Sequence, residues 1–426
     1  MQNWSQNITF GNADLQRPPS IAILQKLVAG CSTCRVVGAA HSFNDIADTA
    51  GTLVSLVDLP PFVQIDPVSS TVTCSAGLLH HELAQALQVE GWALANLPSL
   101  PHFNVVGACV TGTHGSGDSN QALAAAIRGL TFVTATGDLA EISDQSELAT
   151  IAVGLGAFGI VTTVTFAIEP TYAIAQQIYL GAPLASAIDA IDYIMASAYS
   201  VSWFLDWQTD RVDQIWLKHR LEAGERAPAT PEIFAGGRAA RHQLSHSDGA
   251  NDHSLNSNRS TADRCTPQLM QVGPWNERLP HVRNDSPPTP GAQLQSEYFV
   301  ARRHGAEALS AIAAHGPLLG HLLSDGVMSE IRTVAGDGLW LSPFSEDMLA
   351  LHFSWLNDPA AALEALPALE AVLEPFAPKP HWGKLHTMPS SLVRSRYPRF
   401  NEFVTMADAY DPTGKFRNPY LHRLFN

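Results

Sequence analysis

The chain has 426 residues, of which 46% are hydrophobic and 15% charged, and its formal net charge is −15 at pH 7. This proportion of apolar residues excludes a disordered chain. A chain this acidic lacks the excess of Lys and Arg with which proteins bind nucleic acids or anionic membrane surfaces, so we expect neither partner.

The N-terminal segment has no basic stretch followed by an apolar one, and the chain has no run of about 18 apolar residues, so we expect neither a secretory signal nor a membrane-spanning helix. The five cysteines fit a reducing compartment, which predicts a cytoplasmic protein. Cys31 and Cys34 form a C-x-x-C motif, which could be a redox or metal-binding pair. Because no second pair completes a metal site, packing is the favoured interpretation.

Apolar periodicity and turn residues divide the first ~170 residues into short helices and strands. The expected elements, in chain order, are a helix over 20–30, strands over 34–39, 51–59 and 70–77, a helix over 78–92, two strands within 127–143 and a strand within 154–170. Helices and strands do not alternate regularly, which favours an α+β fold over a doubly wound sheet. No Rossmann fingerprint, P-loop or nucleophile elbow is present.

The second half predicts a helix followed by a strand, several further strands and C-terminal helices. The expected elements are a helix and a strand within 182–207, strands over 213–221, 294–302, 328–336 and 349–357, a helix over 361–376, and a helix followed by loops over 406–425. The polar stretch 237–265 resembles a surface insertion. Its His242, His246 and His253 could bind a metal, but nothing rigid holds them, so we expect no metal site.

Three turns rich in glycine and small residues lie beside strands of the N-terminal part, and two of them contain a histidine, His41 or His114. Each turn alone is explained by tight chain reversal. Together they favour a platform for a ligand with a pyrophosphate, because backbone N–H groups in such turns bind anions. Gly38, Ala39 and Ala40 precede His41, and such small side chains let a backbone approach a ligand closely.

Two strands of the second half carry polar pairs at a spacing of two residues. Glu330 and Arg332 form one pair, and His352 and Ser354 form the other. Residues two apart on a strand share a face of the sheet, so each pair could contact a polyhydroxylated substrate. A surface ion pair explains Glu330 and Arg332 equally well. Lys384, in a P-H-W-G-K segment, is by itself more typical of a solvated lysine.

Several stretches, in order from residue 3 to residue 420, resemble the vanillyl-alcohol-oxidase-type flavoproteins, and most of all their alditol oxidase branch. They include RVVGAAHSFNDIA, LPSLPHFNVVGACVTGTHGSG, GPWNERLPHVR, GAQLQSEYF, EIRTVAGDGLWLSP, LHFSW and KPHWGK. The resemblance implies a two-subdomain PCMH-type FAD-binding domain over 1–170, an α+β substrate (cap) domain with an antiparallel sheet over 171–375, and a segment over 376–426 that returns to the FAD domain.

The resemblance also implies the cofactor site, with FAD bonded through its 8α-methyl to His41. Some relatives also tether FAD through a cysteine just upstream of the segment that matches VVGACVTG. This chain has Ser99, Pro101 and His102 there, so the resemblance implies a single covalent bond, and we expect Cys109 to pack in a strand that faces the pyrophosphate. The residues expected to line FAD are Val37, Gly38, Ala39, Ala40, His41, Ser42, Phe43, Ser99, Asn104, Gly107, Thr111, Gly112, Thr113, His114, Gly115 and Val161.

On the substrate side, the resemblance implies hydride transfer from C1 of a polyol such as xylitol or sorbitol to flavin N5, and then reduction of O2 to hydrogen peroxide. The residues expected to bind substrate or to act in catalysis are Ser99, Glu330, Arg332, His352, Ser354 and Lys384. Arg332 and Lys384 would stabilise the alkoxide, His352 is the candidate base, and Glu330 would orient the hydroxyls. Two departures from the branch are Ser354, where it has threonine, and Asn104, where it has serine.

Two alternatives remain open. An aldonolactone oxidase or dehydrogenase would share Glu330, Arg332 and Lys384. A flavoprotein that has lost catalysis would lack the tether histidine or the E-x-R pair, and both are present. We expect a monomer.

Overall fold

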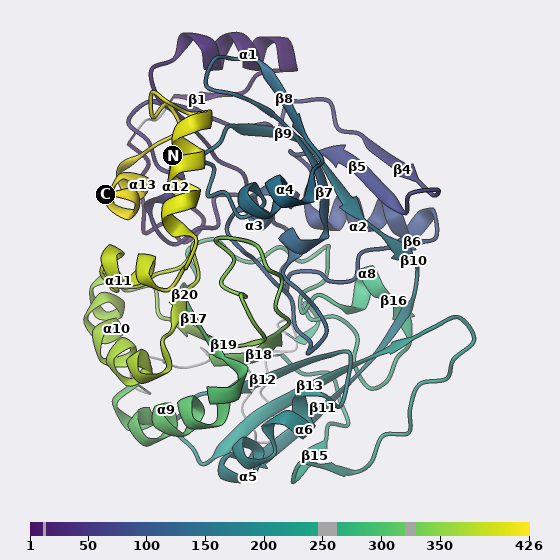
Figure 1. The fold of residues 1–426 in the computed structure, drawn as a ribbon. Helices are drawn as coiled ribbons and strands as arrows, with labels where there is room; N and C mark the ends of the chain where they lie inside the picture. The colour runs from purple at the N-terminus through teal and green to yellow at the C-terminus, as the bar shows by residue number, and fades with distance from the viewer. Residues whose placement is uncertain (12–13, 246–261, 320–328) are drawn as a thin grey trace.

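The computed structural model describes residues 1–11, 14–245, 262–319 and 329–426, and two assemblies of sheets make up this part of the chain (Figure 1). Two small sheets, a separate two-stranded pair and the helices around them contain most of the first 170 residues, and a large antiparallel sheet contains most of the rest. None of the helices in these four ranges is long and apolar enough to cross a bilayer.

The first small sheet is parallel and has the order β1–β3–β2. Its strands are β1 (Leu15–Gln16), β3 (Thr52–Val54) and β2 (Cys34–Val36). Helix α1 (Ile21–Gly30) confirms the expected helix and begins after Ser20, whose side chain accepts a hydrogen bond from the Ile23 N–H. Cys34 is buried in β2, where burial raises the pKa of its thiol, and all five cysteines are free. This environment supports packing as the role of Cys34.

The second small sheet is antiparallel, and its buried face supports the main N-terminal core. Its strands, in order across the sheet, are β4 (Val63–Asp66), β5 (Thr71–Ser75), β9 (Ile160–Ala167), β7 (Ile127–Val133) and β8 (Leu139–Ile142). The associated helices and short strands are α2 (His80–Val89), α3 (Val105–Val110), α4 (Gln145–Ile151), η1 (Asp45–Ala47), η2 (Leu123–Ala126), β6 (Trp92–Ala93) and β10 (Glu169–Pro170). The expected strand at Cys109 is wrong: this residue is buried in α3.

The large sheet has ten strands within the described ranges. They are β14 (Ile233–Phe234), β15 (Gly237–Ala239), β11 (Ala173–Pro183), β13 (Arg211–Leu221), β12 (Ser200–Leu205), β18 (Ser329–Val334), β19 (Met348–Trp355), β17 (Leu294–Ala301) and β20 (Lys379–Pro380) in order, with β16 (Gly273–Pro274) also paired to β11. The sequence analysis missed β11. This strand is buried on both faces, so it lacks the alternation of polar and apolar residues that marks a half-exposed strand.

Helices cover one face of the large sheet and the C-terminal chain returns to the N-terminal sheets (Figure 1). This layer consists of α5 (Leu184–Asp189), α6 (Ile191–Met195), α9 (Gly305–Leu319) and α10 (Pro359–Leu373), with the short η3 (Arg302–His304) and η4 (Glu374–Phe376). Helix α8 (Trp275–Arg278) packs against β11 and α2, and the returning chain contains α11 (Ser390–Ser395), α12 (Phe400–Tyr410) and α13 (Pro419–Phe425). The sequence analysis missed α9, and the loop expected after α12 is wrong in part. Asn418 starts α13 there by accepting a hydrogen bond from the Leu421 N–H.

The expected insertion at 237–265 begins with β15, which pairs with β11 in the large sheet. His246 and His253 lie outside the described residues, and so does the stretch 246–261. Within the described ranges, no group of three or more His, Cys, Asp or Glu side chains could hold a metal ion.

Arg35, in β2, ties the C-terminal segment to the N-terminal sheets. Its buried guanidinium donates hydrogen bonds to the carbonyls of Ile46, Leu155, Gly156 and Phe416 over distances of 2.6–3.0 Å. Burial lowers its pKa to about 10, which leaves the side chain charged at neutral pH. One side chain therefore satisfies carbonyls from three separate loops.

We expect Arg35→Met to destabilise the fold strongly, because four carbonyls lose their donor and each unsatisfied buried group costs about 1–3 kcal/mol. The melting temperature should fall by about 6 °C or more. The matched control is Arg128→Met, since Arg128 is exposed and bonds only to carbonyls of its own neighbourhood. Equal melting temperatures for the two variants would contradict this role of Arg35.

Candidate active site

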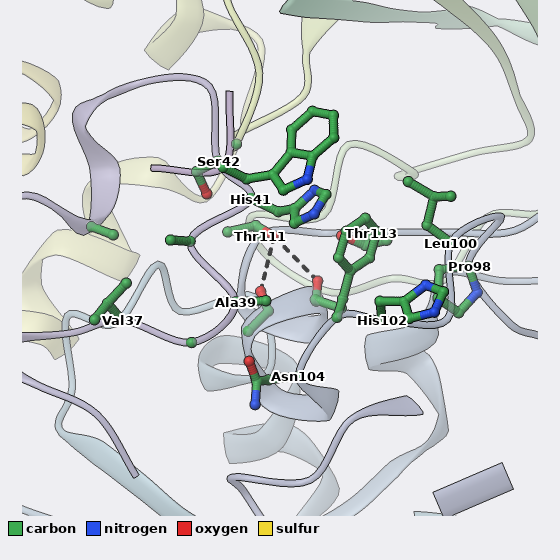
Figure 2. Close-up of a pocket in the computed structure, with 18 of the residues that line it drawn as sticks. Val37, Ala39, His41, Ser42, Pro98, Leu100, His102, Asn104, Thr111 and Thr113 are labelled. Atoms are coloured by element: carbon green, nitrogen blue, oxygen red, sulfur yellow. Dashed lines mark hydrogen bonds between the residues drawn. The ribbon is translucent and has the colours of Figure 1, made fainter. Parts of the chain in front are cut away.

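A cavity of about 950 Å³ lies between the N-terminal sheets and the large sheet. The turn over residues 37–43 and the start of α3 form part of its wall (Figure 2). Charged side chains of the large sheet and of the C-terminal segment form another part. The cavity therefore has a wall of small residues and a wall of charged residues.

The turn before His41 is held close to α3. A Cβ atom on Gly38 would lie 2.4 Å from Oδ1 of Asn104, so no larger residue fits there without movement. Ala40 has a φ of 55°, in the left-handed region that larger side chains rarely adopt, and its carbonyl accepts a hydrogen bond from the Trp4 N–H. The small residues thus fix the direction in which His41 leaves the turn.

The imidazole of His41 lies between two aromatic rings on the cavity wall. Its centroid is 4.4 Å from that of Trp4 in a stacked arrangement and 4.6 Å from that of Phe103. Burial lowers its pKa to about 3, with a smaller contribution from His102, so the ring is neutral at physiological pH. Neither ring nitrogen has a hydrogen bond to a residue of the described ranges, which leaves a nitrogen lone pair available for bonding.

Most of the residues expected at FAD do line this cavity. These are Val37, Gly38, Ala39, Ala40, His41, Ser42, Phe43, Ser99, Asn104, Gly107, Thr111, Thr113, His114 and Val161. Gly112 and Gly115 are not among the lining residues. Cβ atoms at these two positions would meet Pro343 and Asn96, so both glycines allow close packing of the protein against itself.

The charged wall is built by three neighbouring strands that present alternate residues to the cavity. Strand β18 contributes Glu330 and Arg332, and β19 contributes His352 and Ser354. In the register of the sheet, Glu330 lies opposite His352. The spacing of two residues in each pair therefore does place both members at the same site.

The third strand, β17, contributes Glu297, which the sequence analysis did not single out. Glu297 is 1% exposed and lies opposite His352 in the sheet. Its Oε1 accepts a hydrogen bond from Arg332 Nη2 at 2.9 Å, and its Oε2 accepts one from Lys384 Nζ at 2.8 Å. His114 Nε2 lies 3.2 Å from Oε1. One carboxylate thus joins the large sheet, the C-terminal segment and an N-terminal turn.

A sequence signal for Glu297 does exist. Gln295 and Glu297 are two apart, as the pairs on β18 and β19 are, and both line the cavity. The strand that carries them was expected, but the sequence does not show that it pairs with β19. The sequence alone therefore gave no reason to place this carboxylate beside Arg332.

The charges of this wall balance. Burial alone would raise the pKa of Glu297, but Lys384, His114 and Arg332 hold it well below its usual range. Burial lowers the pKa of Lys384, and Glu297 opposes that effect. For Arg332, the two carboxylates Glu330 and Glu297 outweigh burial and raise the pKa. The site therefore contains two carboxylates and two cations in a buried setting.

His352 lies between Lys384 and Ser354. Lys384 Nζ donates to its Nδ1 at 2.7 Å, and its Nε2 lies 3.0 Å from Ser354 Oγ. Burial and the nearby Lys384 lower the pKa of His352 to about 3, so the ring is neutral. Because an ammonium group only donates, the ring proton is on Nε2 and is directed to Ser354.

Arg332 connects this wall to the N-terminal part and to Glu330. Its Nη1 donates to Ser99 Oγ at 3.1 Å, while Nε is buried without a hydrogen-bond partner and lies 3.5 Å from Glu330 Oε1. Arg332 and His281 hold the pKa of Glu330 well below its usual range, against the effect of burial. All six residues expected on the substrate side therefore meet at one end of the cavity.

Comparisons with known proteins agree with this arrangement. A family model for an FAD binding domain matches residues 17–143, and a model for D-arabinono-1,4-lactone oxidase matches residues 290–424. The chain is 38% identical to an alditol oxidase from a Streptomyces species, over 100% of this chain and 98% of the relative. It is 25% identical to an L-gulono-1,4-lactone dehydrogenase from Mycobacterium tuberculosis, over 99% of this chain and 98% of the relative.

The fold is similar to that of a cholesterol oxidase from B. sterolicum, with a TM-score of 0.76 over 100% of this chain and 96% of that one. Their sequence identity is 13%, so this likeness concerns the fold alone.

The residues present fit FAD. The cavity has a volume of about 950 Å³, its wall beside α3 is made of residues small enough for close approach, and His41 offers an unpaired ring nitrogen to it. The charged wall lies at the same cavity, where a substrate would meet the cofactor. Together with the full-length match to the Streptomyces protein, these features show that the chain belongs to the vanillyl-alcohol-oxidase-type family of FAD-dependent oxidoreductases.

Proposed function

We propose that the protein is an FAD-dependent alditol oxidase, which oxidises the C1 hydroxyl of a polyol such as xylitol or sorbitol to the aldose and passes the electrons to O2, forming hydrogen peroxide. The observation that carries this proposal is the convergence of Ser99, Glu330, Arg332, Ser354 and Lys384 at one end of the cavity. Hydroxyl, carboxylate and cationic groups that lie this close together can donate to and accept from several adjacent hydroxyls of one ligand.

An aldonolactone oxidase or dehydrogenase is the second candidate, because a lactone oxidase model matches the C-terminal third of the chain. The identity of 38% to an alditol oxidase, against 25% to a lactone dehydrogenase, favours the alditol assignment. We also propose the division into an FAD domain over 1–170, a substrate domain over 171–375 and a returning segment over 376–426, in which Lys384 completes the site.

In the proposed mechanism, bound FAD supplies the acceptor for the two electrons and the hydrogen that leave C1. Arg332 and Lys384 stabilise the negative charge that develops on the C1 oxygen, in a buried site where such donors act strongly. Glu330 accepts hydrogen bonds from neighbouring hydroxyls and so orients C1. His352, between Lys384 and Ser354, relays the proton that the C1 hydroxyl loses.

We further propose that His41 bonds covalently to FAD. Support comes from the unpaired, neutral imidazole that Trp4 and Phe103 hold at the cavity wall. No cysteine lines the opposite stretch of 98–104, where Ser99 and His102 face the cavity, so a single covalent bond is expected.

The function and the tether can be tested on one preparation. The flavin of the purified protein should bleach when xylitol or sorbitol is added, and hydrogen peroxide should form in air. After acid precipitation, the yellow flavin colour should stay in the pellet. The His41→Ala variant should lose its flavin to the supernatant. Flavin that washes out of the wild-type pellet would contradict the tether, and bleaching by an aldonolactone but not by polyols would favour the second candidate.

Glu297→Gln should lower kcat/KM for the polyol by about 100-fold, because Arg332 and Lys384 lose the carboxylate that positions them and a misplacement of about 1 Å costs about that much in rate. Glu370→Gln is the matched control: Glu370 accepts a hydrogen bond from Tyr298 on the same strand but does not line the cavity. Circular dichroism and flavin content report whether each variant folds. Similar kcat/KM values for the two variants would show that Glu297 has no part in catalysis.

The dependence of kcat/KM on pH should reflect the protonation states of Lys384 and His352. The neutral form of His352 exists above its pKa of about 3, so His352 causes no loss of kcat/KM between pH 5 and pH 8. Lys384 must be protonated, and its pKa is lowered from 10.5, so activity should fall on the alkaline side below that value. In Lys384→Arg the alkaline fall should move to higher pH, because a guanidinium stays charged. An unchanged alkaline limb in this variant would assign that limb to another group.

A further inference from the structure

A buried lysine and histidine lie behind Glu330, on the same face of the large sheet, and the proposed mechanism does not use them. Lys218, on β13, is 1% exposed, and His281, which follows α8, is 7% exposed. His281 Nε2 lies 2.7 Å from Glu330 Oε1, and Lys218 Nζ lies 3.3 Å from His281 Nδ1. The three side chains form a line that ends at the cavity wall.

Backbone carbonyls hold the lysine in place. Lys218 Nζ donates to the carbonyl oxygens of Arg278, Leu279 and Pro280 at 2.5–2.9 Å. The backbone N–H of His281 donates to the Ser99 carbonyl at 2.9 Å, which ties the same loop to the cavity wall. Burial lowers the pKa of Lys218 to about 7. The three carbonyl acceptors match the three N–H donors of an ammonium group, so they favour the charged form directly beside the imidazole.

The two neighbours of His281 require the same ring tautomer. An ammonium group has no lone pair, so Nδ1, which faces Lys218, cannot carry the ring proton. A carboxylate at 2.7 Å needs a donor, so Nε2, which faces Glu330, must carry it. Burial lowers the pKa of His281 to about 4, so the ring is neutral and has only this one proton to give.

Other groups around the line do not offer an alternative arrangement. Ser202, on β12, has its Oγ 3.4 Å from His281 Nε2, while Phe204 and Trp216 contact the ring with their own rings. Arg332, on β18, approaches the same Glu330 oxygen from the other side at 3.5 Å. Oε2 of Glu330 has no hydrogen bond to a residue of the described ranges.

We propose that Lys218 and His281 are positioning residues that hold Glu330 as an ionised acceptor, with one oxygen bound to His281 and the other free to accept a hydrogen bond from a substrate hydroxyl. This inference rests on the proposed function and specifies its substrate class: the ligand must place a hydroxyl donor, not a carbonyl, against Glu330. The selectivity for polyhydroxylated ligands thus depends on His281 at the cavity wall and on Lys218, which does not line the cavity.

Four variants test the proposal. His281→Leu removes the donor to Glu330, and His281→Gln keeps an N–H group at the place of Nε2. Lys218→Met removes the ammonium that fixes the ring proton. Lys379→Met is the matched control, because Lys379 is also buried and donates to a backbone carbonyl, that of Pro343, but has no contact with Glu330.

We expect KM for xylitol to rise about 10- to 100-fold in His281→Leu, the range for a lost hydrogen bond to a charged group, with kcat changed less than about threefold. His281→Gln should stay within about threefold of the wild type, Lys218→Met should raise KM, and Lys379→Met should leave it unchanged. Binding of a polyol that lacks the C1 hydroxyl, followed by the absorbance change of the bound flavin, should weaken in the same order.

The pH dependence of KM separates positioning from a structural defect. Glu330 binds as a carboxylate, so affinity is present above its pKa and is lost as the pH falls through it. Without His281 this pKa rises, and the acid-side loss of affinity should begin at higher pH in His281→Leu than in His281→Gln. Equal KM values and equal acid limbs for His281→Leu, His281→Gln and the wild type would overturn this inference alone. A wild-type protein that retains FAD but neither binds nor oxidises polyols would overturn the proposed function with it.

Discussion

The rest of the site depends on the ion pairs and hydrogen bonds of one buried carboxylate, that of Glu297. It is shared by Arg332, Lys384 and His114, which come from the large sheet, the C-terminal segment and an N-terminal turn. Without it, two buried cations would lie side by side with only Glu330 to balance them. The carboxylate therefore both permits the cations to be buried and fixes the distance between the substrate wall and the cofactor wall.

The fold supplies this arrangement through strand alternation and through the returning chain. The adjacent strands β17, β19 and β18 each direct every second side chain to the cavity. Functional groups two residues apart on a strand, and groups opposite each other on neighbouring strands, therefore lie on one surface. Lys384 reaches the same surface only because the C-terminal segment, which Arg35 also binds through Phe416, passes back along the N-terminal sheets. Beside Glu330, His281 at the cavity wall and Lys218 behind it set the hydrogen bonding of this carboxylate.

Much of the fold and several site residues could be predicted from the sequence, because they depend on local patterns. The small residues before His41 and the spacing of Glu330 and Arg332 are local features, and the structure places all three residues on the cavity. Glu297, Lys218 and His281 could not be predicted as members of the site, because their roles depend on strand pairing and on a loop that lies over the sheet. Strand β11 was missed because both of its faces are buried. The strand expected at Cys109 was wrong, and the apolar run around this residue could not correct it, because a run of six residues fits a strand and a short helix equally well.

The central claim is that this charged wall holds C1 of a polyol against the flavin. Anaerobic stopped-flow reduction of the bound flavin by xylitol, compared with xylitol deuterated at both terminal carbons, tests it most directly. We expect xylitol to reduce the flavin and deuterium to slow this step, because the hydrogen that leaves is the one on C1. Reduction at the same rate with both substrates, or no reduction by the polyol, would contradict it.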